Sequence, residues 1–284
     1  MWPFLFEPYP HFFITIFKHQ NDFHMKHQLA KIINSLGVIF LIGMNMLAVL
    51  LPLNDKTTGE LSAMYPNLFV PAGFTFAIWS LIYLLLITFV LYLWLGKKKE
   101  MVIEKIGFLF IINAIANGLW LVFWHYLMIK ISFLVMLVLL STLILMYKKL
   151  NVSYFSDSQS PWQAKVPISV YMGWISVATI ANFTVVLVSS GVDQLSFGAD
   201  TWAAIMLSIA ILLALFFLYK KKDIFFAGVV TWASFGIYSK RIADSTTIDP
   251  NIEHVSYIGM YLLLISIVLT IVLGILNRNK TAKD

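Results

Sequence analysis

The chain has 284 residues, of which 60% are hydrophobic and 12% are charged, whereas soluble domains average about 45–50% and about 25%. This composition indicates an integral membrane protein, and the absence of cysteine excludes disulfides, thiolate metal sites and cysteine nucleophiles. The net charge of +6 comes from lysines clustered at the ends of hydrophobic runs, so we interpret it as a topology signal and expect no nucleic-acid partner.

Residues 1–30 form an aromatic segment without a membrane-spanning run. Pro3, Pro8 and Pro10 interrupt it, so no apolar stretch reaches the roughly 20 residues that a transmembrane helix needs. Met25 opens the sequence MKHQLAKIINSLG, which is typical of the basic start of a membrane protein. We therefore interpret residues 1–30 as a cytoplasmic N-terminal segment and expect translation to start at Met25, with an interfacial anchor as the alternative.

Eight hydrophobic runs follow, each able to cross a hydrocarbon core of about 30 Å. They cover residues 32–52, 72–95, 107–127, 131–147, 167–189, 202–219, 224–239 and 255–276, and the seventh is the weakest. With the N-terminus inside the cell, sixteen of the twenty Lys and Arg residues fall in cytoplasmic segments. The sequence therefore predicts an all-α, multi-pass helix bundle of the cell membrane, with about eight transmembrane helices and both termini cytoplasmic.

Two connections between these runs carry structural information. The loop between the first two runs is longer than the usual 2–8 residues between helices and contains three prolines. It is either a solvated connector or a cover for a cavity, and we expect residues 54–70 to act as a lid. Only a few residues around Lys130 separate the third and fourth runs, so these helices must be antiparallel neighbours.

Three of the expected helices carry aromatic and amide side chains at offsets 0, 4, 7 and 11, which is one face of a helix with about 3.6 residues per turn. These stripes are Ala72, Phe76, Trp79 and Tyr83; Asn113, Asn117, Trp120 and Trp124; and Pro167, Tyr171, Trp174 and Ala178, with Asn182 a turn further on. Indole faces combined with amides suit a flat, largely apolar ligand that accepts or donates some hydrogen bonds.

Simpler explanations exist for both residue types. Buried amides often join helices, at about 0.6 kcal/mol on average, and tryptophans form belts at the membrane interface. Four tryptophans near helix ends fit such a belt, and three lie deeper and do not. The belt candidates are Trp94, Trp124, Trp162 and Trp202, and the deeper residues are Trp79, Trp120 and Trp174.

Charge is absent from the interior of all eight runs, and Asp200 and Asp223 only border the sixth and seventh. Ion-coupled transporters usually mark their pathway with buried ionisable residues, so the pattern disfavours a proton-driven antiporter. His125 is the sole histidine within a run and can in principle ligate haem iron. Beside Trp124 and Tyr126 we interpret it as an interfacial residue, and we expect no metal site.

The three stripes resemble the TspO/MBR family, the tryptophan-rich sensory proteins that include bacterial TspO and the mitochondrial translocator protein. The second, third and fifth runs each match one family motif. The matching residues are Pro71, Gly73, Phe76, Trp79 and Tyr83; Asn117, Trp120, Phe123 and Trp124; and Tyr171, Trp174, Ser176, Ala178 and Asn182. The family loop usually supplies further tryptophans, where this chain has Glu60 and Phe69.

The resemblance covers residues 31–190. It implies a five-helix bundle whose cavity, beneath the first long loop, binds porphyrins and other tetrapyrroles and, in some members, sterols or synthetic isoquinoline and benzodiazepine ligands. Some bacterial members are implicated in light- or oxygen-dependent porphyrin breakdown, for which Trp79 is the matching residue. The seventh run contains TWASFGIY, which faintly echoes FAIWSLIY in the second, but its Trp-to-Tyr spacing differs and indicates no repeat.

We thus predict three parts: the segment 1–30, a TspO-like five-helix bundle over 31–190, and three further transmembrane helices with a short cytoplasmic tail over 191–284.

The predicted function is a membrane receptor or sensor for a flat hydrophobic ligand such as a tetrapyrrole, with no required cofactor and no assigned catalytic residue. The alternatives are a transporter of neutral lipophilic solutes and a light-dependent porphyrin-degrading enzyme. Expected partners are the bilayer, the ligand and a second copy of the chain packed through small residues such as Gly173. The predicted ligand-binding residues are Phe76, Trp79, Tyr83, Asn117, Trp120, Phe123, Tyr171, Trp174, Ala178 and Asn182.

Overall fold

The computed structural model describes residues 10–281 apart from 52, 66, 156–159, 192–197 and 245–249, and it describes side chains between 25 and 277. These residues form helices and loops without any strand, which confirms the all-α prediction. Residues 1–9 of the predicted N-terminal segment lie outside the described residues. The proposed start at Met25 stays a prediction.

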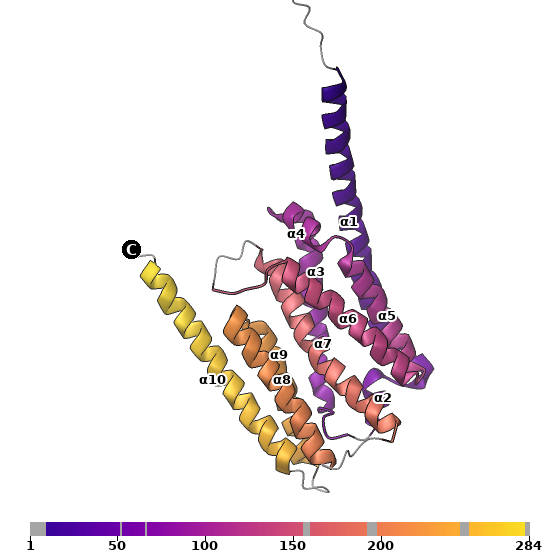
Figure 1. Ribbon diagram of the computed structural model, residues 1–284. Coiled ribbons are helices and arrows are strands. Elements are labelled where there is room, and N and C mark those ends of the chain that lie inside the picture. Colours follow the sequence, from indigo (N-terminus) through magenta and orange to yellow (C-terminus); the bar gives the residue numbers. More distant parts are fainter. Residues whose placement is uncertain are drawn as a thin grey trace, which may run out of the picture.

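Among the described residues, eight long helices form a bundle in which successive helices run in alternate directions (Figure 1). Two short helices, α2 and α4, and two 3₁₀ turns, η1 and η2, connect them. The long helices are α1 (Pro10–Leu50), α3 (Ile78–Leu95), α5 (Leu109–His125), α6 (Ile129–Lys149), α7 (Trp162–Ser189), α8 (Ala199–Lys221), α9 (Ile224–Ala243) and α10 (Pro250–Thr281). The connecting pieces are η1 (Leu53–Asp55), α2 (Thr58–Ala63), η2 (Gly73–Ala77) and α4 (Lys99–Ile106). The start of α1 and the end of α10 lie at the same end of the bundle (Figure 1).

Helix α1 begins earlier than the predicted first run. Pro10 occupies its first position, where a proline is tolerated because the N–H there has no partner within the helix. No proline follows until the helix has ended, so nothing interrupts the backbone between Pro10 and Leu50. The prediction that Pro10 interrupts the segment was therefore wrong, whereas Pro3 and Pro8 lie outside the described residues.

Membrane crossing is supported for fewer helices than the eight predicted. Within the described ranges, six helices are long and apolar enough to span a bilayer, or seven if α4 and α5, bent by 57°, form one span. The remaining run, α9, is 20 residues long but carries Lys240 and Arg241 in its last turn. Because α9 packs against α7, α8 and α10, most of its surface meets protein and does not need to be strongly apolar.

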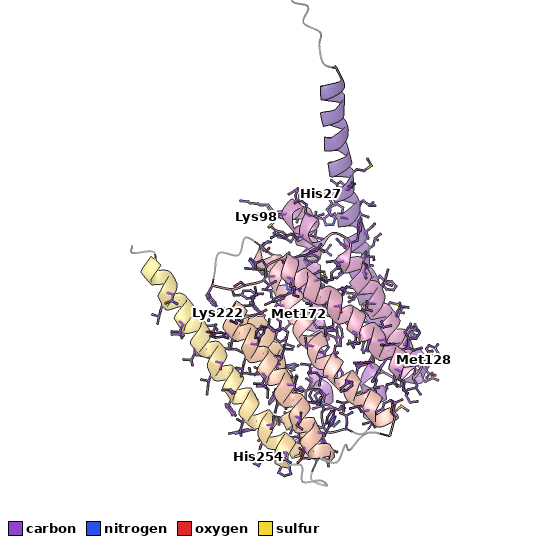
Figure 2. All side chains as sticks on the ribbon, in the orientation of Figure 1. His27, Lys98, Met128, Met172, Lys222 and His254 are labelled. Carbon is purple, nitrogen blue, oxygen red and sulfur yellow. The ribbon has the colours of Figure 1, made fainter. Side chains whose placement is uncertain are left out.

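The short connection between α5 and α6 makes these two helices neighbours in the bundle. Only Tyr126–Met128 separate α5 from α6, and these two helices pack against each other, as predicted. Helix α1 packs on α3 and α5, and α7 contacts α3, α6 and α9, which makes α7 the central helix. Lys98 lies at the end where α1 enters, and Met128 and His254 lie at the opposite end (Figure 2).

Buried amides join the helices across the bundle. Asn45 Nδ2 on α1 donates to Asn117 Oδ1 on α5 at 2.6 Å, and Asn117 Nδ2 donates to the Tyr171 hydroxyl on α7 at 3.1 Å. A second link runs from Asn113 Nδ2 on α5 to Thr142 Oγ1 on α6 at 2.8 Å. An unpaired amide is costly in an apolar interior, so these bonds fix which helices are neighbours and in which register.

Asp223 forms a buried polar centre between three helices. It caps the N-terminus of α9 by accepting from the amides of Phe225 and Phe226, at 3.2 and 3.0 Å. Its carboxylate also accepts from Tyr147 on α6 at 2.8 Å and from Ser169 on α7 at 2.6 Å. The carboxylate thereby ties α9 to α6 and α7.

Replacing Asp223→Ala is expected to lower the midpoint of thermal unfolding in detergent by about 5 °C or more. Two buried hydroxyls and two helix amides lose their acceptor, and each buried unsatisfied group costs about 1–3 kcal/mol. Circular dichroism during heating measures the change. The control is Asp200→Ala, which also removes two backbone hydrogen bonds but at a partly exposed site where water can replace them. Equal losses in both variants would contradict the prediction.

Candidate functional site

An apolar cavity lies between α3, α5 and α7, beneath residues 54–70, which we call the lid. The volume of the cavity is about 60 Å³. Aromatic and small aliphatic side chains form most of the lining. The lining residues are Thr58, Ser62, Phe69, Val70, Pro71, Phe76, Trp79, Trp120, Trp124, Trp174, Val177, Ala178, Ala181, Asn182 and Val185.

Aromatic rings from η2, α3 and α7 meet across one side of the cavity. The Phe76 ring lies edge-on to Trp174 with 5.9 Å between centroids, and Trp79 lies edge-on to Trp174 at 6.5 Å. Behind the cavity surface, Trp79 stacks on Tyr83 at 5.7 Å and meets the edge of Tyr171 at 5.9 Å. Each indole is therefore held by other rings, which fixes its orientation.

Two stacked indoles on α5 form the opposite side. The rings of Trp120 and Trp124 are 6.2 Å apart and nearly parallel. Trp120 Nε1 donates to Asn182 Oδ1 on α7 at 3.2 Å, and Asn182 Nδ2 donates to the Ala178 carbonyl at 3.0 Å. Both polar atoms of the Asn182 amide are thus hydrogen-bonded to the protein, which leaves little hydrogen-bonding capacity for a ligand.

The lid is attached to α5 by side-chain hydrogen bonds. Trp124 Nε1 donates to the Thr58 carbonyl at 3.3 Å, and Asn54 Nδ2 donates to the His125 carbonyl at 3.0 Å. Thr57 and Glu60 form a capping box at the start of α2, and these hydrogen bonds hold the pKa of the exposed Glu60 carboxyl below its ordinary value. The lid is therefore a small folded unit that rests on the aromatic wall.

Six of the ten predicted ligand-binding residues line the cavity: Phe76, Trp79, Trp120, Trp174, Ala178 and Asn182. Tyr83 and Tyr171 lie behind Trp79, and Asn117 holds Tyr171. Phe123 does not line it, because its position is about 100° around the helix from Trp124. The role of these residues as ligand contacts stays a prediction.

The interfacial interpretation was wrong for Trp124 and His125. Trp124 is 3% exposed and lines the cavity, and His125 is fully buried with Nδ1 2.7 Å from the Leu121 carbonyl oxygen. The lid covers this end of α5, so residues near the helix end are enclosed by protein. The helical stripe that joins Trp124 to Trp120 was the available signal. Trp94 and Trp162, in contrast, are exposed near helix ends as a belt requires.

The chemistry of the lining is neutral. No charged side chain is among the described residues that line the cavity. Protein partners hold the indole N–H groups of Trp120 and Trp124, whereas the described residues accept no hydrogen bond from Trp79 or Trp174. The cavity therefore offers ring faces and two free indole donors. Within the described ranges, no cluster of three residues suited to holding a metal ion is found.

Size constrains how a ligand enters. Pockets for drug-sized molecules usually measure about 300–1,000 Å³, whereas this cavity measures about 60 Å³. A flat ligand of drug-like size fits into this cavity only after the lid or the wall side chains move. The hydrogen bonds between the lid and α5 are thus the contacts that such a movement has to break.

Replacing Trp124→Phe should loosen the lid, because the ring can still stack on Trp120 while the N–H bond to Thr58 is lost. We expect backbone amides of residues 58–63 to exchange about two- to tenfold faster with deuterium, matching a hydrogen bond of about 0.5–1.5 kcal/mol. Mass spectrometry measures the exchange. Trp94→Phe is the control, since it removes an indole bond to Ser35 away from the lid. Unchanged exchange in the lid of Trp124→Phe would refute the attachment.

One comparison with known proteins confirms the predicted family. A family model described as TSPO-like protein matches residues 31–269. It continues past residue 190, where the sequence motifs end, through α8, α9 and most of α10, and the division of the chain at 190 stays a prediction. Comparisons with curated proteins and with solved structures gave no match. Because the family model covers most of the chain, the protein belongs to the TSPO-like protein family.

Proposed function

We propose that this protein is a membrane receptor or sensor that binds a flat hydrophobic ligand, such as a tetrapyrrole, in the cavity beneath the lid. The observation that carries the proposal is the convergence of four indoles, Trp79, Trp120, Trp124 and Trp174, from three helices on one enclosed space. Aromatic pairs contribute about 0.5–1.5 kcal/mol each beyond the area that they bury. A planar ligand can contact several of these rings at once.

The composition of the lining supports a receptor over a transporter. All lining residues come from the lid, its extension to η2, and helices α3, α5 and α7. A transport path for neutral solutes needs access from both ends of the bundle, yet the additional helices α8 to α10 add no residue to this cavity. The enclosed position beneath the lid suits retention of one ligand and transmission of its presence through lid movement.

A titration of the detergent-solubilised protein with protoporphyrin IX tests the proposal. Tryptophan fluorescence and porphyrin absorbance should show saturable binding in the micromolar range. The Trp79→Phe, Trp174→Phe double variant should bind about tenfold more weakly, because two ring contacts shrink and two donors disappear. A Trp94→Phe, Trp162→Phe double variant, which changes two exposed indoles, should bind as the parent does.

The outcome of the titration separates the candidate functions. Binding that does not saturate, or equal binding by both double variants, would overturn the tetrapyrrole receptor. Repeating the titration in light tests the enzyme alternative. Light-dependent loss of porphyrin absorbance that Trp79→Phe abolishes, while binding remains, would replace the receptor with a porphyrin-degrading activity.

A further inference from the structure

Helix α9 contacts the chain directly behind the cavity wall. The Ala72 amide donates to the Gly236 carbonyl on α9 at 2.9 Å, and Trp232 Nε1 on α9 donates to the Thr75 carbonyl at 2.9 Å. Ala72 follows Pro71 in sequence, and Thr75 precedes Phe76, and both of these neighbours line the cavity. The position of η2, and with it part of the wall, therefore depends on α9.

The contact between η2 and α9 is closely packed at both Thr75 and Phe74. Thr75 is fully buried, and a Cβ at Gly236 would overlap the Thr75 side chain, so only glycine allows η2 to approach this near. On the other side, Phe74 packs against the rings of Trp232 and Phe235, at 5.5 and 5.6 Å. Trp232, Phe235 and Gly236 lie in the TWASFGIY stretch, which thus packs on η2.

Helix α9 is also fixed to α7. A Cβ at Gly173 on α7 would lie 3.1 Å from Val229 Cβ, which shows how closely α7 and α9 approach. Ser169 on α7 donates to Asp223 at the beginning of α9. One helix thus holds both α7, which carries Trp174, and η2, which carries Phe76.

We propose that α9 is a brace that sets the width of the ligand cavity, with Trp232 and Gly236 as positioning residues. Neither residue lines the cavity, so each acts through η2. A displacement of η2 away from α7 separates Phe76 from Trp174, whose edge contact of 5.9 Å closes this side of the cavity. The effect on ligand affinity rests on the proposed function, whereas the effect on the distance between the walls does not.

The first test compares two glycine substitutions on the same helix. Gly236→Ala places a methyl group against Thr75, whereas Gly228→Ala adds the same group where nothing lies within 4 Å. Protoporphyrin IX should bind Gly236→Ala about tenfold more weakly than the parent, as expected when buried polar contacts of η2 are lost, and Gly228→Ala should match the parent. If Gly236→Ala does not fold, Trp232→Phe replaces it, because this change keeps an aromatic ring and removes the N–H that donates to Thr75.

The second test needs no ligand. The chain has no cysteine, so Ala77→Cys on η2 and Ser189→Cys on α7, both exposed, allow two spin labels to be attached selectively. Pulsed electron paramagnetic resonance should then show a longer or broader distance distribution in Gly236→Ala than in Gly228→Ala, and likewise in Trp232→Phe.

The two tests fail in different ways. Unchanged distances in Gly236→Ala and Trp232→Phe would overturn the brace, even if the parent binds porphyrin. Failure of the parent to bind would count against the proposed function alone, and the distances would still decide whether α9 positions the wall. Changed distances without any change in the affinity of a parent that binds would also overturn the proposal, since the width would not govern binding.

Discussion

The structure depends on the pairing of polar groups inside an apolar interior. Lipid tails and leucine side chains are similarly apolar, so burial alone does not distinguish one helix neighbour from another. The amides of Asn45, Asn113 and Asn117 and the carboxylate of Asp223 do distinguish them, because each needs a partner at one height on one adjacent helix. These few bonds fix the order of the bundle, and the aliphatic side chains fill the remaining space.

The same requirement shapes the cavity. Asn182 lines the cavity, but its oxygen and its nitrogen are both occupied, by Trp120 and by the Ala178 carbonyl. Its function is therefore to hold an indole in place. In the proposed function, recognition rests on the shape and the ring faces of the walls.

The features of the site that could be predicted from the sequence were those that depend on helical periodicity. The 3.6-residue stripes placed Phe76, Trp79, Trp120 and Trp174 together, since a helix determines which residues share a face. The burial of Trp124 depended on the lid folding back over α5, which periodicity does not report. The contact of Trp232 with Thr75 spans 157 residues of sequence, and nothing in either segment alone encodes it.

The order of synthesis determines when the hydrogen bonds of Asp223 can form. Ser169 and its acceptor are 54 residues apart in the chain. At about 5–20 residues per second, the ribosome makes Asp223 about 3–11 s after Ser169. During that interval the Ser169 and Tyr147 hydroxyls lack this acceptor, although α6 has already been made and α7 is completed. The nascent bundle thus reaches its final polar pairing only when α9 emerges, which makes the late helices part of its biogenesis.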